Sequence, residues 1–257
     1  MAFIELKNNV KMHYIEKGKG EDTILFIHGN LANTIWWEET LSRMPEKYRG
    51  IALDLPGSGQ SPETGERHTM SYFAELVYEF TEKLGLTSFH LVGHSMGGGV
   101  SQRFTLAYPA KVKKLVLLDA MAADGFHVLY ERGELAMTML MSNIQLLDVA
   151  IRGVAPKCQD EAFLKRAVES AFSASKQVFL EQPVTMHEEN WFSRLSEIKC
   201  PVLFLHGEKD NFVPKDGSER TAKNIPNCIF KYLPDCGHSP QVEVPELFCK
   251  ELFDFLN

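Results

Sequence analysis

Three residues that lie far apart in the sequence, Ser95, Asp210 and His238, have the types needed for nucleophilic catalysis. A serine hydroxyl is a weak nucleophile at neutral pH, so it needs a base to take its proton. The base needs a third group to fix its tautomer and stabilise its charged form. In this arrangement His238 would take the proton from Ser95, and Asp210 would hold His238 from the other side. The chemistry would be acylation of the serine followed by attack of water.

Ser95 stands between two glycines that fit a sharp turn from a strand into a helix. The apolar residues before it favour a buried strand, and residues 100–107 carry apolar side chains at helical spacing. Gly93 and Gly97 fit a joint in which larger side chains would collide, and such a turn lifts the hydroxyl clear of the sheet. The alternative is a glycine-rich turn with an incidental serine, and this pattern alone does not decide between them.

Two backbone N–H groups are candidates for an oxyanion hole. Negative charge that develops on a substrate carbonyl needs fixed hydrogen-bond donors. The turn supplies the N–H of Met96, and the loop after the apolar run at residues 24–27 supplies that of Asn30. Neither side chain is required for this role.

A mostly parallel sheet is the element that can position these residues. Strand-like runs alternate with helical patterns, which favours a parallel sheet with helices on both faces. Eight strands are predicted, at residues 3–7, 10–16, 24–27, 50–54, 88–92, 114–119, 201–205 and 229–233. The first two form a hairpin around two asparagines. Ser95, Asp210 and His238 each follow a strand, and parallel strands end at one edge of the sheet, so the three can meet there.

Residues 120–198 show no strand-like run and keep helical spacing. We therefore predict an α/β core at 1–119 and 199–257 with an all-helical cap at 120–198. A methionine-rich cap would line an adaptable apolar pocket above the strand ends. The alternative is that these side chains only pack the cap onto the core. The candidate pocket residues are Trp36, Trp37, Met137 and Met141.

The bulk composition limits the partners. A chain of 257 residues with 44% hydrophobic content can bury a large core, and one domain is the default. The formal charge of −7 and the lack of a long Lys or Arg run make nucleic acid an unexpected partner. No leader-like start and no long uncharged apolar run are visible, so we expect a cytoplasmic protein that does not bind membranes. The oligomeric state is not indicated.

Several residues compete for the same roles. Five cysteines without a C-x-x-C pair are expected to be reduced, although Cys236 lies close enough to His238 to suggest a Cys–His pair. Asp119 also ends a strand and is an alternative acid. Asp235 lies so close to His238 in sequence that it is less favoured as the acid. Asp54 at a strand end is more simply structural. His28 and His94 adjoin turn glycines and look structural, and no set of residues has metal-ligand spacing.

Taken together, these motifs resemble the α/β-hydrolase family over nearly the whole chain. They are His28-Gly29 after a strand, the GHSMGG run at 93–98, the HGEKD run at 206–210 and Gly237-His238. The family's order of nucleophile, acid and histidine is the order here. The resemblance implies a serine hydrolase with a helical cap and no cofactor.

Differences from the motifs of other branches of the family narrow the range of expected substrates. Dehalogenases and epoxide hydrolases of the family carry Asp where this chain has Ser95, and the loop at 28–32 lacks the G-P-G usual in the carbon–carbon bond hydrolases. A carboxylic ester of a small to medium apolar acyl or aryl group is the expected substrate. The alternatives are a lactone, such as an acyl-homoserine lactone, or a thioester. A non-catalytic small-molecule receptor and a cofactor-free perhydrolase or haloperoxidase are alternatives of other classes.

Overall fold

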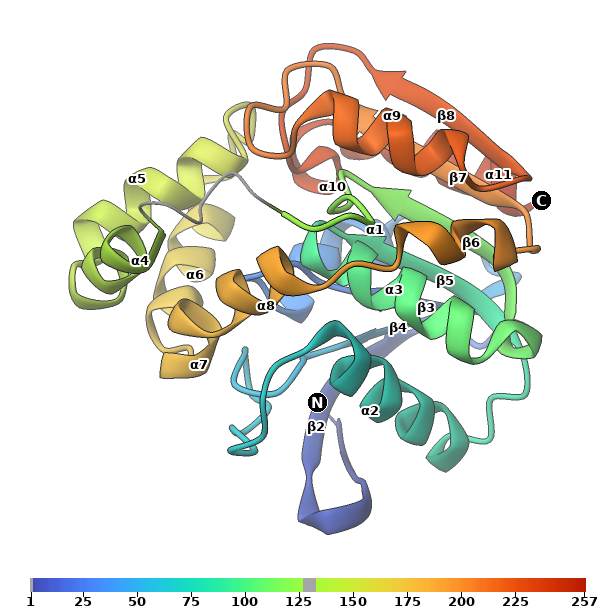
Figure 1. Cartoon of the computed structure of the whole chain (residues 1–257), viewed down its shortest axis with the longest axis horizontal. Coiled ribbons are helices and arrows are strands. Elements are labelled where there is room, and N and C mark those ends of the chain that lie inside the picture. The colour runs from blue at the N-terminus through green and yellow to red at the C-terminus, as the bar shows by residue number, and fades with distance from the viewer. Residues whose placement is uncertain (1, 127–132) are drawn as a thin grey trace.

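The computed structural model describes residues 2–126 and 133–257, and its centre is one eight-stranded sheet (Figure 1). The strand order is β1-β2-β4-β3-β5-β6-β7-β8. Strand β2 pairs antiparallel with both β1 and β4, and every other pair in the sheet is parallel. The predicted mostly parallel eight-stranded sheet flanked by helices is confirmed.

The strands are β1 Ala2–Glu5, β2 Lys11–Lys17, β3 Asp22–Ile27, β4 Tyr48–Leu53, β5 Phe89–His94, β6 Val112–Leu118, β7 Val202–Gly207 and β8 Cys228–Leu233. The α-helices are α1 Glu38–Ser42, α2 Met70–Lys83, α3 Met96–Ala107, α4 Gly133–Ser142, α5 Ile144–Val154, α6 Glu161–Phe172, α7 Lys176–Leu180, α8 Gln182–Glu188, α9 Lys215–Lys223, α10 Pro240–Glu243 and α11 Pro245–Leu256. The short 3₁₀ helices are η1 Lys7–Asn9, η2 Thr34–Trp37, η3 Pro109–Lys111 and η4 Phe192–Glu197.

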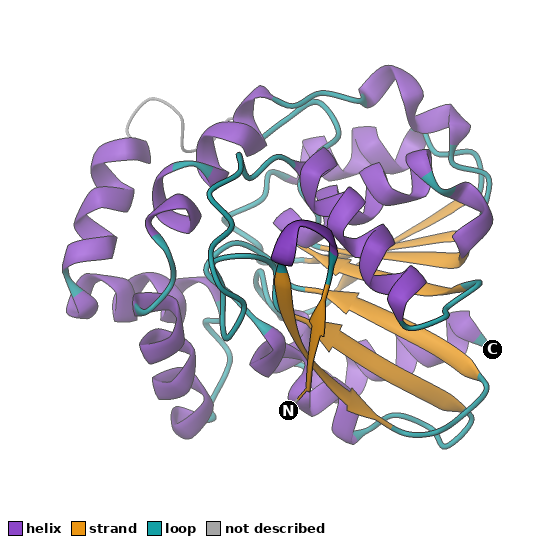
Figure 2. Cartoon of the chain, turned by 90° about the horizontal axis from the view of Figure 1, so that it is seen from below, coloured by secondary structure: helices purple, strands orange, loops and turns teal. Residues whose placement is uncertain are grey.

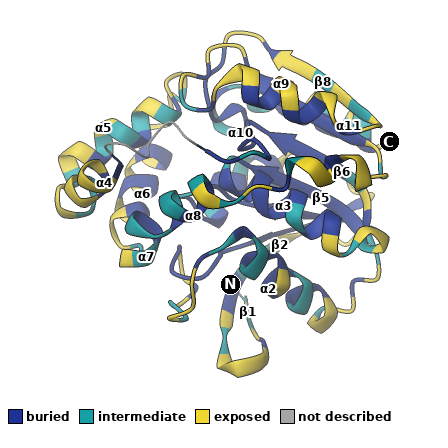
Figure 3. Cartoon of the chain, viewed as in Figure 1, coloured by how far each residue is buried: buried dark blue, intermediate teal, exposed yellow. Residues whose placement is uncertain are grey.

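The sheet is covered on both faces, which explains why its inner strands read as continuous apolar runs (Figures 2 and 3). Successive side chains of a strand point to opposite faces. Leu25 and Leu91 accordingly pack with α2, α3 and α9, whereas Phe26 and Val92 pack with α1 and α11. Two hydrophobic layers therefore hold the strand ends in a fixed relation.

Helices α4 to α8, here called the inserted helices, lie between β6 and β7 in sequence. They gather beside the sheet at its carboxyl edge (Figure 1), and in the described part of this segment there is no strand. Their apolar side chains form a separate cluster that includes Leu147, Leu164 and Phe179 and takes in Trp36 from the core. The insert thus has its own packing and shares a boundary with η2.

None of the described helices is by itself long and apolar enough to cross a membrane. Only α4 and α5 taken together meet the test of length and composition, and they are bent by 116° to one another.

Some local features differ from expectation. The hairpin is present, and Asn8 and Asn9 adopt positive φ angles of 55° and 60°, but they belong to a 3₁₀ turn that links shorter strands. Helix α9 was not expected, because its sequence is mostly polar and its buried residues are small: Gly217, Ser218, Thr221 and Ala222.

Candidate active site

Ser95 lies at the joint between β5 and α3 with φ 54° and ψ −120°, a backbone conformation that residues other than glycine rarely adopt. Three hydrogen bonds hold it there. Its N–H donates to the carbonyl of Leu118 at 3.0 Å, and its carbonyl accepts from the N–H groups of Gly98 at 2.9 Å and Met121 at 3.1 Å. The strain is therefore supported by the next strand and by the start of the helix.

The glycines beside Ser95 are required by close backbone contacts. A Cβ atom on Gly97 would lie 2.4 Å from the carbonyl oxygen of His28, and one on Gly93 would lie 2.3 Å from the carbonyl oxygen of Gly97. Real Cβ atoms do not approach backbone so closely. The predicted sharp turn is confirmed, and it exists because β5, α3 and the end of β3 meet without side chains between them.

Asp210 and His238 are brought together at the ends of β7 and β8. Nδ1 of His238 lies 2.9 Å from Oδ2 of Asp210. The other oxygen, Oδ1, accepts from the N–H groups of Phe212 at 2.7 Å and Val213 at 3.1 Å. Burial alone would raise the pKa of Asp210, but His238 and these donors outweigh it and lower the pKa to about 2. The carboxylate is therefore ionised and fixed in orientation.

Ser95 and His238 both line one cavity of about 390 Å³ beneath the inserted helices. In the described part of the chain the Ser95 side chain makes no hydrogen bond, so its hydroxyl is directed to no protein acceptor. Bonds between a nucleophile and its base are often long before substrate binds. The structure thus places the predicted nucleophile in the same cavity as the joined base and acid.

The loop that carries His238 is anchored by a residue that the sequence analysis missed, Glu243. Its carboxylate accepts from Gly237 N–H at 2.9 Å and from Ser239 N–H at 2.8 Å, on either side of the histidine. The same carboxylate accepts from Lys157 N–H at 3.2 Å, and the Ser239 hydroxyl donates to the carbonyl of Val154 at 2.7 Å. The only signal in the sequence is an acid soon after Ser-Pro at a helix start.

His28 and His94 make structural hydrogen bonds, as their positions beside turn glycines indicated. Nε2 of His94 donates to the carbonyl of His238 at 2.8 Å, and burial lowers the pKa of His94 to about 3, so this ring stays neutral. His28 accepts from Leu55 N–H at 2.9 Å and donates from Nδ1 to the carbonyl of Gly29 at 2.7 Å. These bonds support the base loop and the loop that carries Asn30.

The two predicted oxyanion donors are close to the cavity. Asn30 lines it, and Met96 is the first residue of α3, where a helix leaves its N–H groups without internal acceptors. Within the described residues neither N–H donates a hydrogen bond. The Asn30 side chain points elsewhere and donates to the carbonyl of Val178 at 2.8 Å and to Oε1 of Gln182 at 2.7 Å.

Only half of the predicted pocket residues line the cavity. Trp36 and Met137 do, but Trp37 and Met141 do not. Trp37 is fully buried against Phe26 under the sheet, because neighbouring residues of the 3₁₀ helix η2 point in different directions. Met141 packs against the cluster inside the insert. The cavity lining that the sequence did not single out includes Leu31, Met121, Phe126, Leu140, Ile151, Val154, Met186, Phe212 and Val213.

The cavity is mostly apolar. Among its described lining residues, Lys209 is the one lysine or arginine, and its ammonium is paired with Asp235. Asp235 also accepts from Lys157 at 3.1 Å and is exposed, so it is not placed as a partner of His238. Cys236 is buried, and burial raises the pKa of its thiol to about 12, which disfavours the Cys–His alternative.

Asp54 has the structural role that its position indicated. Its two carboxylate oxygens accept from Thr34 N–H at 2.7 Å, Gln60 N–H at 2.9 Å and Nδ1 of His13 at 2.7 Å. It therefore fixes the loop after β3 to the loop after β4.

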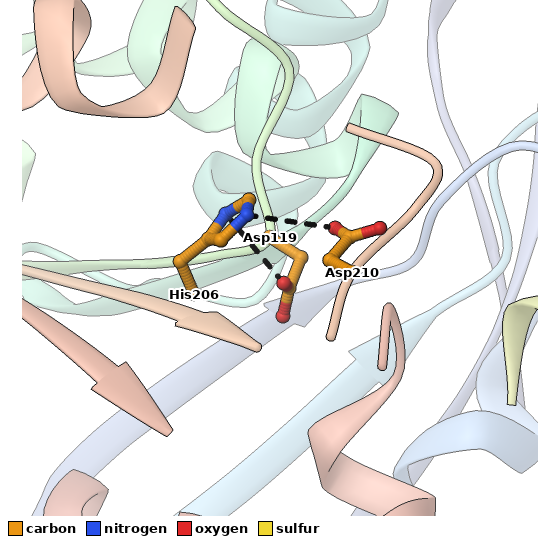
Figure 4. Close-up of side chains that lie close together, drawn as sticks. All are labelled: Asp119, His206 and Asp210. Atoms are coloured by element: carbon orange, nitrogen blue, oxygen red, sulfur yellow. Dashed lines mark ion pairs between the residues drawn. The ribbon is translucent and has the colours of Figure 1, made fainter. Parts of the chain in front are cut away.

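Asp210 also belongs to a buried cluster of polar side chains, together with Asp119 and His206 (Figure 4). Nδ1 of His206 is 3.6 Å from Asp119, and Nε2 is 4.0 Å from Asp210, so neither contact is a hydrogen bond. Burial lowers the pKa of His206 to about 4, so the ring is neutral and these contacts carry little charge attraction. The two nitrogens face different carboxyl groups, and Asp210 is already bonded to His238. The grouping therefore does not have the geometry of a single metal site.

Asp119, the alternative acid, is held in this cluster. Its Oδ1 accepts from Gly207 N–H at 2.7 Å. Burial, reinforced by the charge of Asp210, raises the pKa of Asp119 well above its usual range, which favours the neutral form of this group. A neutral acid cannot stabilise a charged histidine as an aspartate does.

Asp119→Asn is expected to leave kcat within about threefold of wild type, because an amide offers the same acceptor and donor pattern as the protonated acid. The native state binds an extra proton at Asp119, so wild-type stability should fall as pH rises above the unfolded pKa of 3.8. Asn does not titrate, so the variant should gain stability relative to wild type as pH rises. Melting temperatures of both proteins from pH 4 to 9 measure this, and a constant difference would contradict it.

A family model and a sequence relative both match this chain to hydrolases. Residues 22–145 match a family model described as alpha/beta hydrolase fold. A 2-hydroxy-6-oxononadienedioate/2-hydroxy-6-oxononatrienedioate hydrolase of Paraburkholderia phymatum is 29% identical over an alignment of 279 residues, which covers 98% of this chain and 93% of that protein.

Solved structures show the same fold. An esterase from Exiguobacterium antarcticum matches with a TM-score of 0.88 and 23% identity, covering 98% of each chain. An enol-lactonase from Burkholderia xenovorans matches with a TM-score of 0.87 and 17% identity, covering 99% of each chain. At these identities the likeness concerns the fold alone.

Proposed function

We propose that this chain, which has the α/β-hydrolase fold, is a serine hydrolase that cleaves carboxylic esters of small to medium apolar acyl or aryl groups. The observation that carries the proposal is the hydrogen bond of 2.9 Å between His238 and Asp210 at the wall of an apolar cavity that Ser95 also lines. This arrangement would offer a bound carbonyl a nucleophile, a base for that nucleophile and a carboxylate that orients the base.

In the proposed mechanism Ser95 Oγ attacks the ester carbonyl while Nε2 of His238 takes the hydroxyl proton. The oxyanion accepts hydrogen bonds from the N–H groups of Asn30 and Met96, and one such donor is typically worth about 3 kcal/mol. His238 then gives its proton to the leaving alcohol, which leaves an acyl group on Ser95. Water, deprotonated by His238, attacks the acyl group and restores the serine. Asp210 stabilises the charged His238 in both halves.

We also propose that the inserted helices act as a cap that selects the substrate. They contribute Met137, Ile151 and Met186 to the cavity lining, so an apolar group bound above Ser95 would be buried against them. Apolar burial is worth roughly 25 cal/mol per Å² removed from water. An ester with an uncharged acyl chain fits this lining.

A second candidate is hydrolysis of a carbon–carbon bond beside a ketone, because the Paraburkholderia phymatum relative is named for a dienedioate substrate. A dioate carries two carboxylates, and burying them needs cationic partners. Among the described lining residues the only lysine or arginine is Lys209, which is paired with Asp235. The apolar lining therefore favours the ester.

Turnover of a substrate panel tests the proposal. The purified protein is assayed on p-nitrophenyl butyrate, a medium-chain lactone, an acyl thioester and 2-hydroxy-6-oxononadienedioate, and intact mass is recorded after rapid quenching. We expect the highest kcat/KM for the p-nitrophenyl ester, exceeding the dienedioate by about 100-fold, with an acyl adduct on Ser95. The highest kcat/KM on the dienedioate would establish the second candidate instead. A single slow turnover with retained product would indicate a receptor.

A further inference from the structure

A chain of buried polar side chains runs from the Asn30 side chain into the inserted helices. Nδ2 of Asn30 donates to Oε1 of Gln182 at 2.7 Å, and Nε2 of Gln182 lies 3.1 Å from Nδ1 of His68. Nε2 of His68 lies 2.8 Å from Oε1 of Glu63. Gln182 and His68 are both fully buried. Their exposed area is zero, so each hydrogen bond lost here would leave a polar atom without water.

The carbonyl of Val178 sets the direction of every bond in this chain. A carbonyl only accepts, so the Asn30 atom 2.8 Å from Val178 O must be the amide nitrogen. That nitrogen then also donates to Gln182, which must present its oxygen to Asn30 and its nitrogen to His68. His68 therefore accepts at Nδ1 and donates from Nε2 to Glu63. No residue in the chain can be turned around without breaking its neighbour's bond.

The far end of the chain is also anchored. Glu63 accepts from Thr64 N–H at 2.7 Å and from the Ser175 hydroxyl at 2.5 Å. Burial alone would raise the pKa of Glu63, but these donors and His68 hold it below its usual value, so the carboxylate is ionised. The chain thus ends on a fixed charge and ties the start of α7 to the loop after β4.

Gln182 itself is not part of the cavity wall, whereas Asn30 is. Its side chain instead attaches Asn30 to α8. The two donors of the Asn30 amide are both taken by the inserted helices, through Val178 of α7 and Gln182 of α8. The backbone N–H of Asn30 is one of the two proposed oxyanion donors. Errors of about 1 Å in such a group cost up to 100-fold in rate.

We infer that Gln182 is a positioning residue for the oxyanion hole, through which α8 holds the Asn30 N–H at the place where substrate charge develops. This rests on the serine-hydrolase function proposed above. Because the donor acts on the transition state more than on the bound ester, loss of Gln182 should lower kcat and leave KM nearly unchanged.

The test uses the full chain and p-nitrophenyl butyrate. Gln182→Leu, which has a similar volume but no polar atoms, is expected to lower kcat about tenfold with KM within about twofold. It should weaken inhibition by a trifluoromethyl ketone, which forms a tetrahedral oxyanion on the serine, by the same factor. Gln182→Glu keeps an oxygen acceptor for Asn30 but loses the N–H that Gln182 gives to His68, so its kcat should lie between those of wild type and Gln182→Leu.

Thr185→Val is the matched control. The Thr185 hydroxyl donates to the carbonyl of His68 at 2.7 Å, so this variant removes a buried bond between the same helix and the same loop without touching Asn30. Its kcat should stay within about twofold of wild type. An unchanged kcat in Gln182→Leu, or an equal loss in Thr185→Val, would overturn the inference. Absence of any wild-type ester turnover would instead refute the proposed function.

Discussion

Ser95→Ala is expected to lower kcat on p-nitrophenyl butyrate by about 10⁶-fold, because a methyl group can neither attack the carbonyl nor carry the acyl intermediate. Any remaining rate would come from the oxyanion donors and binding alone. Alanine keeps the strained φ of 54° and the same backbone hydrogen bonds, so the fold should survive the change. Steady-state kcat and the mass of the quenched protein measure the effect, and no acyl adduct should form.

Ser101→Ala is the control for this prediction. Ser101 lies on the same helix α3, is fully buried and donates from its hydroxyl to the carbonyl of Gly97 at 2.8 Å. Its loss removes a structural bond near the turn but no reacting atom, so kcat should stay within about threefold. Ester turnover in Ser95→Ala that matches Ser101→Ala would show that the serine at the turn is not the nucleophile.

Asp210→Asn is expected to lower kcat by about 10⁴-fold, the size of effect seen when a triad acid is replaced by its amide. The structure shows why the amide cannot substitute. The N–H groups of Phe212 and Val213 require an acceptor, so the asparagine oxygen must face them and its NH₂ group must face His238. The NH₂ group would donate to Nδ1 and place the ring proton on Nε2, where it blocks proton transfer from Ser95.

The measurement is kcat against pH for wild type and Asp210→Asn, with Asp119→Asn as the matched control. Asp119 is a second buried carboxyl group in the same cluster (Figure 4), and burial raises its pKa, which favours the neutral form. The two variants should therefore differ by about three orders of magnitude or more in kcat. A large loss in Asp119→Asn with little loss in Asp210→Asn would move the acid role to Asp119.

The parts that the sequence predicted best are those fixed by strand ends. Parallel strands that terminate at one edge place Ser95, Asp210 and His238 together whatever the loop lengths between them, so alternation of strands and helices was sufficient. The glycines around Ser95 carried equally local information, because backbone contact at Gly93 and Gly97 excludes other residues. This constraint is steric, and the sequence shows it directly as two glycines close to the serine.

What the sequence could not predict depends on side-chain direction and on contacts between distant segments. Trp36 and Trp37 are adjacent residues of the same type, but Trp36 lines the cavity and Trp37 is buried in the core. Glu243 and Gln182 carry no local pattern for their roles, since their partners lie in other loops. The cluster of Asp119 and His206 with Asp210 arises only because β6 and β7 are neighbours in the sheet.

The anchoring of the His238 loop has a consequence for protein engineering. Val154 and Lys157, at and just beyond the end of α5, hold Ser239 and Glu243, while Val178 holds the Asn30 amide. In each of these contacts the atom from the insert belongs to the main chain, so an insert grafted from a relative would keep them only if its backbone followed the same path. An exchange of the insert is therefore expected to change substrate selectivity and turnover rate together. A chimaera that keeps its turnover rate should also need the residues of the His238 loop that match the new insert.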